Sequence, residues 1–570
     1  MKETGGMALH KGLQRLRELR FIELFLLVAL YAVGLFYEFL SCAASVALCV
    51  YLMVRAAKTG SLRLRGNLLS AAVAVIALFY ALSALWAVDA GMAVWGFFKY
   101  LPAPLFLLAL MQDPGARERA LDLLPTAACV MTVTSAVLLQ IPALRSLFSV
   151  AGRLSGFFQY ANTFALFLLL ALVVLVTGET LTWRTWVQAA ILLGGILYSG
   201  SRTVFVLLLA AVAVLVIFHP QKRVRWGLAF VVLLGIGAAA GAALITGRMD
   251  SIGRFLTTSL TESTFVGRLL YFQDALPLIL RHPFGLGYMG YYYIQPSIQT
   301  GVYSVMFIHN DFLQLLLDVG WIPALLLAAA LVRAFFRRGA GLRTRLLLLL
   351  FAAHCCFDFD LQFTGMLLLL LTIAYREEGR EWIWKKPRVP VVAGGAAAAA
   401  LALYMGTAQL LSQVGQYGAA LALYPGNTTA RVALLTQETT ADGMDQAADR
   451  ILRQNTCLSV AYSAKARAAF ARGDFQEVIR NKRLALERAP FASEEYEDYC
   501  RMLMTGIGLY EQAGDAYSAQ VCRDELLQAA HQMETLDSRL SPLGKRIVDQ
   551  PRTELAADIR AYRDALPAAD

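Results

Sequence analysis

The stretch "FIHNDFLQLLLDVGW", residues 307–321, sets three polar residues directly before a run of Leu. These residues are His309, Asn310 and Asp311. Asn and Asp suit the cap and first turn of a helix, because their oxygens accept hydrogen bonds from backbone amides that have no partner there. The stretch therefore predicts an apolar helix that begins near residue 310 and carries a histidine at its entrance.

The rest of the chain shares this apolar character. Of its 570 residues, 58% are hydrophobic and 16% are charged, whereas soluble proteins carry about a quarter charged residues. A helix that crosses a membrane needs roughly 20 mostly apolar residues. We therefore predict an all-α, polytopic membrane helix bundle with about 13 spans. The predicted spans are 21–38, 39–54, 67–87, 94–111, 121–140, 159–177, 186–200, 203–218, 226–246, 310–333, 346–357, 360–375 and 389–410.

Basic residues indicate which way the bundle faces. Lys and Arg gather in alternate loops, and these segments are expected in the cytoplasm because basic residues resist translocation. The N-terminus is then cytoplasmic and the part after the last span is external. The net charge of +10 is mostly a sign of this topology, because the chain after residue 410 holds more acidic than basic residues. No nucleic-acid partner is expected.

The composition divides the chain into three parts. Residues 1–20 form a basic cytoplasmic N-terminus, and residues 21–410 form the membrane domain, whose long external loop covers 247–308. Residues 411–570 form a soluble helical domain, in which Ala461–Pro490 has the pattern of a tetratricopeptide-type helical hairpin. Such a domain binds a peptide or a partner protein in its groove, or it only stabilises the exported face.

A few external side chains suit chemistry. A helix cap needs no imidazole, so His309 is a candidate base; the alternative is an interfacial histidine without a chemical role. Arg153, Arg202 and Arg268 stand where helices meet the outer surface, against the topological bias. Their guanidinium groups fit phosphate oxygens, although each can also extend toward lipid headgroups. The histidines show no metal-ligand spacing, so no metal site is predicted.

These pieces together resemble a known family. The chain resembles the O-antigen ligase and polymerase superfamily of bacterial membrane glycan transferases over residues 68–373. The motifs that carry the resemblance are "RLSGFFQYANTFA" from Arg153, "SGSRTVF" from Ser199, "GRLLYFQDALPLILRHPFGLG" from Gly267, and "HNDFLQLLLDVGWIPALLL" from His309. Asp318 stands where the family often has Glu, which keeps the acid.

The resemblance implies a role for each candidate. His309 would activate the hydroxyl of the acceptor, while Arg202 and Arg268, with weaker support for Arg153, would hold the diphosphate of the donor. Asn310, Asp311 and Asp318 would support the site. The donor would be a polyprenyl-diphosphate-linked glycan, and the acceptor a glycolipid, a glycan or a protein. No cofactor is implied.

Two alternatives stay open beside a ligase. A polymerase would extend the glycan on its own carrier, with the same residues. A flippase or transporter of lipid-linked glycans, a different class, would also show many spans, but it does not need a polar histidine motif after a long external loop. The expected location is the bacterial cytoplasmic membrane, with the C-terminal helical domain outside and available to a protein partner.

Overall fold

The computed structural model describes residues 20–178, 182–219 and 263–566, with a few further positions between 221 and 241. Three predicted features therefore lie wholly or partly outside the described residues. They are the basic N-terminus 1–20, most of the span at 226–246, and the first part of the external loop, 247–262.

The described chain is mostly helical, which confirms the predicted helical class. The helices of the membrane part are α2 (Phe21–Tyr31), α3 (Glu38–Thr59), α4 (Leu68–Ser83), α5 (Ala90–Tyr100), α6 (Pro102–Leu110), α7 (Ala116–Leu138), α8 (Arg145–Phe148), α9 (Ala161–Val176), α10 (Trp183–Ser199), α11 (Arg202–Phe218), α14 (Ser263–Arg281), α15 (Gly290–Ile298), α16 (Asp311–Val319), α17 (Trp321–Phe336), α18 (Leu342–Cys355), α19 (Thr364–Ala374) and α20 (Arg388–Gln413). Short 3₁₀ turns are η1 (Val33–Leu35), η2 (Pro142–Leu144), η3 (Gly156–Phe158) and η4 (Asp360–Gln362).

Four helices within the described residues are long and apolar enough to cross a membrane. They are α3, the continuous pair α5 and α6, α7, and α20. Shorter apolar helices include α2, α4, α9, α11, α17 and α19. The membrane character is thus supported, while the number of about 13 spans stays a prediction.

Several predicted spans are interrupted, for identifiable reasons. The span at 21–38 stops at Tyr31, because Val33, Gly34 and Leu35 all have positive φ angles and cannot continue an α-helix. The span at 310–333 divides at Gly320, which has a φ of 82°. A Cβ at Gly320 would lie 2.1 Å from the carbonyl oxygen of Pro283. The close approach of the loop after α14 therefore requires glycine at this break.

The centre of the membrane part is formed by α9 and α19. Every residue of α19 is buried, and α9 is buried along most of its length. A helix that is apolar on all sides is typical of a protein core or of a membrane span. Contacts with α7, α10 and α18 bury α9 inside the bundle. This core supports the polar region at the start of α9 and the end of α18.

Two small sheets depart from the all-α prediction. Strand β1 (Ser61–Gly66) pairs antiparallel with β4 (Arg380–Lys385), with Ser61 opposite Lys385. Strand β2 (Ser149–Val150) pairs with β3 (Arg153–Leu154) in the same way. Both pairs connect helices, and the second carries Arg153 toward the ends of α9 and α10.

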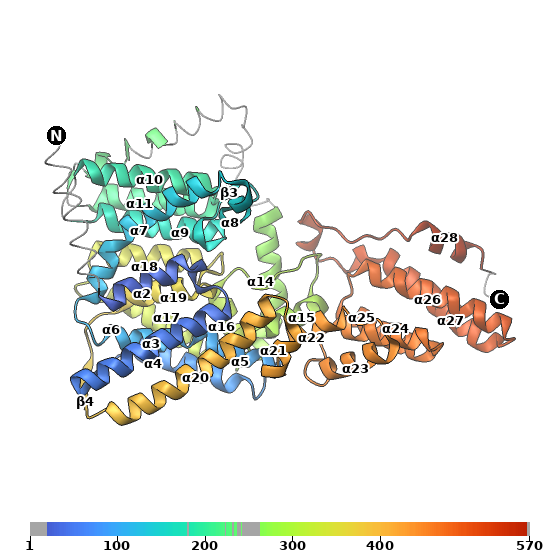
Figure 1. Ribbon diagram of the computed structural model, residues 1–570. Helices are drawn as coiled ribbons and strands as arrows, with labels where there is room; N and C mark the ends of the chain where they lie inside the picture. Colours follow the sequence, from blue (N-terminus) through green and yellow to red (C-terminus); the bar gives the residue numbers. More distant parts are fainter. Residues whose placement is uncertain are drawn as a thin grey trace.

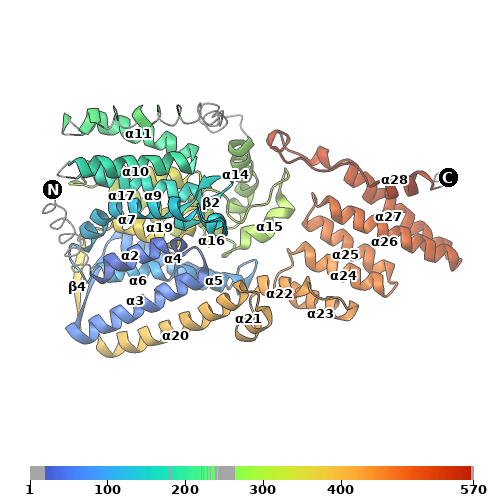
Figure 2. The same cartoon turned by 45° about the horizontal axis from the view of Figure 1, so that its top comes forward.

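The C-terminal helices form an elongated array that extends away from the bundle (Figures 1 and 2). Neighbouring helices pack in pairs, notably α24 with α25 and α26 with α27. The elements are α21 (Tyr417–Leu423), α22 (Thr428–Leu435), α23 (Ala441–Leu452), α24 (Ser459–Ala471), α25 (Phe475–Arg488), α26 (Ser493–Gln512), α27 (Ala516–Glu534), η5 (Leu536–Arg539), η6 (Gly544–Arg546) and α28 (Ala557–Asp564). The assignment of this array to the tetratricopeptide class stays a prediction.

Within the described residues, hydrogen bonds attach the array to the bundle at two places, in addition to the packing of α15 against α25. Asp89, fully buried, accepts hydrogen bonds from Thr428 at 2.5 Å, Gln454 at 2.7 Å and Asn455 at 3.0 Å. At the second place, the amide of Ser541 donates to the carbonyl oxygen of Thr300 at 2.9 Å. The array is therefore held against the loop that leads from α15 toward His309.

Candidate active site

His309 lies immediately before α16, in a constrained backbone conformation. Asn310 is the N-cap of α16, as predicted, and its side chain accepts a hydrogen bond from Leu313 N at 3.0 Å. His309 itself has a φ of 55°, which is uncommon for a residue other than glycine. Strained backbone of this kind persists only where the surroundings enforce it, and it gathers at functional sites. The side chain is 22% exposed, so the ring is anchored yet reachable.

The partner of His309 is Asp358, which lies in the turn between α18 and η4. The Nδ1 atom of His309 is 3.3 Å from Oδ1 of Asp358. The same carboxylate accepts hydrogen bonds from Tyr160 and Asn162, each at 2.7 Å. Arg268 of α14 donates to Oδ2 at 3.4 Å. One carboxylate, 1% exposed, thus joins four side chains from three separate segments.

The neighbours of Asp358 decide its charge. Burial alone raises the pKa of a carboxyl group. Here the hydrogen bond with His309 and the positive charge of Arg268 outweigh burial, so the pKa of Asp358 lies well below its usual range. Asp358 is therefore an anion at neutral pH, and it favours a proton on the Nδ1 atom that faces it.

This contact orients the imidazole for proton transfer. When Nδ1 carries the proton and donates to Asp358, the Nε2 atom keeps its lone pair and serves as an acceptor. The ring of Phe359 meets the imidazole edge-on, with 4.9 Å between the centroids. A carboxylate that fixes the tautomer and stabilises the resulting imidazolium is the arrangement that a general base requires.

The predicted arginines approach this cluster from several elements. Arg153 donates from Nη2 to Oδ1 of Asn162 at 2.5 Å and from Nε to the carbonyl oxygen of Ser199 at 2.7 Å. Asn162 in turn bonds to Asp358, so Arg153 and Arg268 belong to one network. Arg202 is the first residue of α11 and follows the Ser199 corner that Arg153 contacts. The structure thus brings Arg153, Arg268 and His309 together, and places Arg202 at the adjoining helix junction.

The carboxylate of Asp311 contacts η4, whereas the nearby His309 contacts Asp358. The two carboxylate oxygens of Asp311 each accept from Leu361 N at 3.1 Å, so Asp311 fixes η4 to the start of α16. Asp318 is buried near the other end of α16, where Tyr80 donates to it at 2.9 Å and Gln314 at 2.8 Å. The amide oxygen of Gln314 accepts from Ile308 N at 3.0 Å, which fixes the residue that precedes His309.

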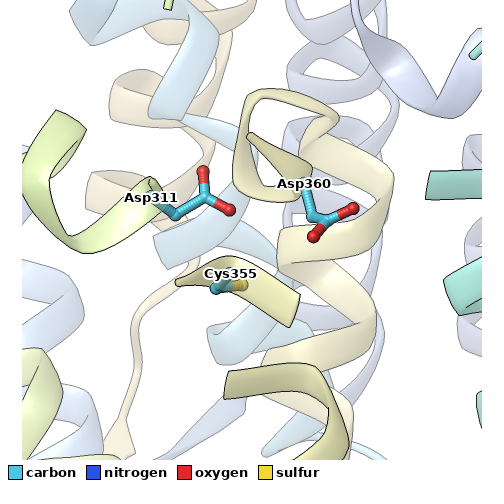
Figure 3. Close-up of side chains that lie close together, drawn as sticks. All are labelled: Asp311, Cys355 and Asp360. Atoms are coloured by element: carbon cyan, nitrogen blue, oxygen red, sulfur yellow. The ribbon is translucent and has the colours of Figure 1, made fainter. Parts of the chain in front are cut away.

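A second group of polar side chains includes residues from the same turn as Asp358 and from the start of α16. Asp311, Cys355 and Asp360 are all buried and close enough together to hold a metal ion (Figure 3). Both carboxylates already have protein donors, however. Asp360 contacts His354 at 2.5 Å and Thr163 at 2.7 Å, and Asp311 accepts from the backbone of η4. The hydrogen bonds alone account for the arrangement, which fastens the turn with Asp358 to α16 and α9.

Sequence reasoning did not single out Asp358, Tyr160 or Asn162, which form the centre of this cluster. The turn "HCCFDFD", residues 354–360, contains Asp358, and "QYANTFA", residues 159–165, contains Tyr160 and Asn162. The only signal in the sequence is polar residues at the ends of otherwise apolar helices. The tyrosines of the external loop are mostly structural, since Tyr288, Tyr291, Tyr293 and Tyr303 are buried.

A comparison with known protein families bears on the same region. Residues 187–353 match the family model described as O-Antigen ligase (Wzy_C). This match supports the O-antigen ligase superfamily, a group of membrane enzymes that ligate or polymerise glycans. The matched segment contains Arg202, Arg268 and His309, and it ends before Asp358. No curated protein and no solved structure matches the chain.

Proposed function

We propose that the protein transfers a glycan from a polyprenyl diphosphate carrier to an acceptor hydroxyl at the outer face of the bacterial cytoplasmic membrane. The observation that carries this proposal is the contact of His309 with a carboxylate that Arg268 also binds. It holds an imidazole and a guanidinium on one buried carboxylate, which supports their roles as base and phosphate-binding cation. The O-antigen ligase match over the same helices supports the proposal.

The proposed chemistry follows from these positions. Nε2 of His309 removes the proton from the acceptor hydroxyl, whose oxygen then forms a bond with the anomeric carbon of the donor sugar. The bond from that carbon to the diphosphate oxygen breaks, and the diphosphate leaves with the electron pair. Inversion at the anomeric carbon is expected, because the attack and the departure occur on opposite sides.

The arginines would stabilise the leaving group. A guanidinium has five N–H donors, and one donor of Arg268 bonds to Asp358 within the described residues. The remaining donors of Arg268, together with Arg202 and Arg153, would neutralise the diphosphate as its charge develops. Fixed cations placed where charge develops lower the barrier of such a step. The positive charge that stabilises the diphosphate would thus come from arginine side chains of the protein.

The orientation of the chain agrees with this location of the site. Helix α20 precedes the C-terminal array, and the array contacts the loop before His309. With the N-terminus cytoplasmic, the array and His309 would both lie on the outer side, where lipid-linked glycans are presented. The array would remain available to a partner protein.

Glycan analysis of a deletion strain tests the function. The strain is complemented with wild-type protein, His309→Ala or His282→Ala at matched protein levels. His282 is exposed at the end of α14 and serves as the matched control. We expect His309→Ala to leave the glycan on its lipid carrier, and His282→Ala to restore the wild-type product. Full restoration by His309→Ala would show that the base is misassigned.

The same experiment separates the alternative reactions. A ligase defect leaves finished glycan on the carrier, whereas a polymerase defect leaves single repeat units there. Transfer by purified protein in detergent, without ATP or an ion gradient, would exclude a transporter. Absence of transfer under those conditions, with donor and acceptor both present, would count against an enzyme of either kind.

A further inference from the structure

A cleft lies between the external loop and the C-terminal array. It encloses about 520 Å³ and is bounded on one side by Ser297 of α15 and on the other by residues of α25, α26 and α27. Its size is within the range of ordinary ligand sites, which occur preferentially between domains. Helix α15 packs directly against α25, and Figure 2 shows α15 between α14 and the array. The cleft therefore belongs to both parts of the molecule.

The accessible lining of the cleft consists of amides and charged groups. Its apolar residues, among them Leu486 and Ala529, are buried and offer little surface to a ligand. Gln528 and Arg539 are exposed, and Gln532 is partly exposed. Within the described residues, no hydrogen bond involves the side chains of these three residues. They are therefore available as donors and acceptors for a ligand.

The charges of the lining are balanced. Two arginines and two glutamates face the cleft: Arg483, Arg539, Glu487 and Glu525. Arg483 and Tyr499 both bond to Glu525, at 3.0 Å and 2.8 Å, so this part of the wall is fixed. A wall without excess charge does not favour a phosphate or an acidic peptide. It suits a neutral ligand with many hydroxyl groups, which both donate and accept hydrogen bonds.

The cleft is connected to the candidate active site by a fixed loop. Asp274 of α14 accepts hydrogen bonds from Thr300 N at 2.8 Å and from the Tyr303 hydroxyl at 2.9 Å. The ring centroids of Tyr303 and Tyr271 are 4.5 Å apart, and the centroids of the Tyr271 and His309 rings are 6.1 Å apart. The loop also lines a second cavity of about 670 Å³ at Val302. Space for a chain of sugars is thus present beside the loop that leads to His309.

We propose that this cleft binds the acceptor as a glycan chain and directs its terminal hydroxyl toward His309. The proposal rests on the proposed function and specifies its acceptor class. The apolar side chains of the lining are buried, so the apolar side chains of a peptide would find few contacts there. A glycan needs amide and carboxylate groups in a preformed wall, which Gln528, Gln532 and Glu487 provide.

Paired amide substitutions test the cleft in the full-length protein in lipid nanodiscs. The test variant is Gln528→Ala/Gln532→Ala, and the matched control is Gln512→Ala/Gln520→Ala, which removes two amides from exposed positions of α26 and α27 outside the cleft lining. The probe is a set of oligosaccharides released from the surface polysaccharide of the producing cells. Binding is measured by calorimetry, and transfer is measured in parallel with a lipid-linked donor.

We expect the test variant to bind the oligosaccharides about tenfold more weakly, because two hydrogen bonds are lost. Its KM for the acceptor should rise by a similar factor, while kcat stays close to wild type. The control variant should behave as wild type. Equal binding by both variants would overturn the proposal, and so would binding of peptides, instead of sugars, that depends on the two amides.

The two proposals fail in different ways. If wild-type protein transfers glycan normally and the amide variants bind equally, the function stands and the cleft is misassigned. If oligosaccharide binding depends on Gln528 and Gln532 but wild-type protein transfers nothing, the cleft stands and the function is wrong. Thermal unfolding of each variant shows that a loss of binding does not come from a loss of folding.

Discussion

Two buried aspartates, Asp89 and Asp358, have nearly the same exposure and very different neighbours. Among the described residues, Asp89 accepts hydrogen bonds from neutral groups alone: the backbone of Met92 and the side chains of Thr428, Gln454 and Asn455. Asp358 also accepts from neutral groups, but two of its partners are His309 and Arg268. Both carboxylates are almost fully buried, so the difference lies in what surrounds them.

This difference separates a structural role from a chemical one. The neutral donors around Asp89 satisfy its oxygens and join the C-terminal array to α5, and none of them titrates near neutral pH. Two partners of Asp358, His309 and Arg268, are basic and partly exposed, so they contact the carboxylate on one side and can contact a ligand on the other. Burial alone therefore does not distinguish the two acids, whereas the charge and exposure of the partners make Asp358 the candidate for a chemical role.

The largest effect is expected from Asp358→Asn. An amide cannot stabilise the imidazolium of His309, and it favours the wrong ring tautomer, so kcat should fall by about 10²–10⁴-fold. The low pKa keeps Asp358 ionised, so the loss should persist at every pH between about 5 and 9. Initial rates of glycan transfer across that range provide the measurement.

Asp89→Asn is the matched control for this experiment. It makes the same chemical change in an equally buried carboxylate whose partners are neutral. We expect it to leave kcat within about threefold of wild type, because the partners of Asp89 belong to the attachment of the array and not to the His309 contact, although the amide keeps only one of the two acceptor oxygens. If both substitutions slowed transfer equally, the distinction between the two aspartates would fail.

A smaller effect is expected from Arg268→Lys. Lysine keeps the positive charge but loses the planar fork that binds carboxylate and phosphate together, so transfer should slow by about 10–10²-fold. The apparent KM for the lipid-linked donor should rise at the same time. Arg281→Lys is the control, since Arg281 is exposed at the other end of α14. An unchanged donor KM in Arg268→Lys would remove this arginine from the diphosphate site.

The sequence was sufficient for features that depend on local patterns. Asn310 was predicted as a helix cap, and the structure confirms it, because a cap is decided by residues a few positions apart. The breaks at Val33–Leu35 and at Gly320 were not predicted, since hydropathy is continuous across both. At Gly320 the break depends on the approach of Pro283, which is distant in the chain.

The candidate site could likewise be predicted from the sequence only where local patterns indicate it. His309 stood out because it is polar, external and unexplained by the cap. Its partner Asp358 lies 49 residues away, in a turn where an acid is unremarkable by itself. The contact of Asp358 with Asn162 spans 196 residues. No periodicity or spacing indicates such pairs, so the sequence pointed to His309 as a candidate base, and only the fold shows the carboxylate that contacts it.

The smallest effect on chemistry, and the clearest effect on stability, is expected from Asp89→Ala. The substitution leaves the side chains of Thr428, Gln454 and Asn455 without their buried acceptor, and each unsatisfied buried group costs about 1–3 kcal/mol. Because these donors belong to the C-terminal array, the loss should appear at its attachment to α5. Limited proteolysis should release the array faster than in wild type, and the thermal unfolding midpoint should fall. Asp122→Ala is the control, since Asp122 is 66% exposed. Proteolysis at the wild-type rate would show that the other contacts, among them the one at Thr300 and the packing of α15 against α25, are sufficient to hold the array.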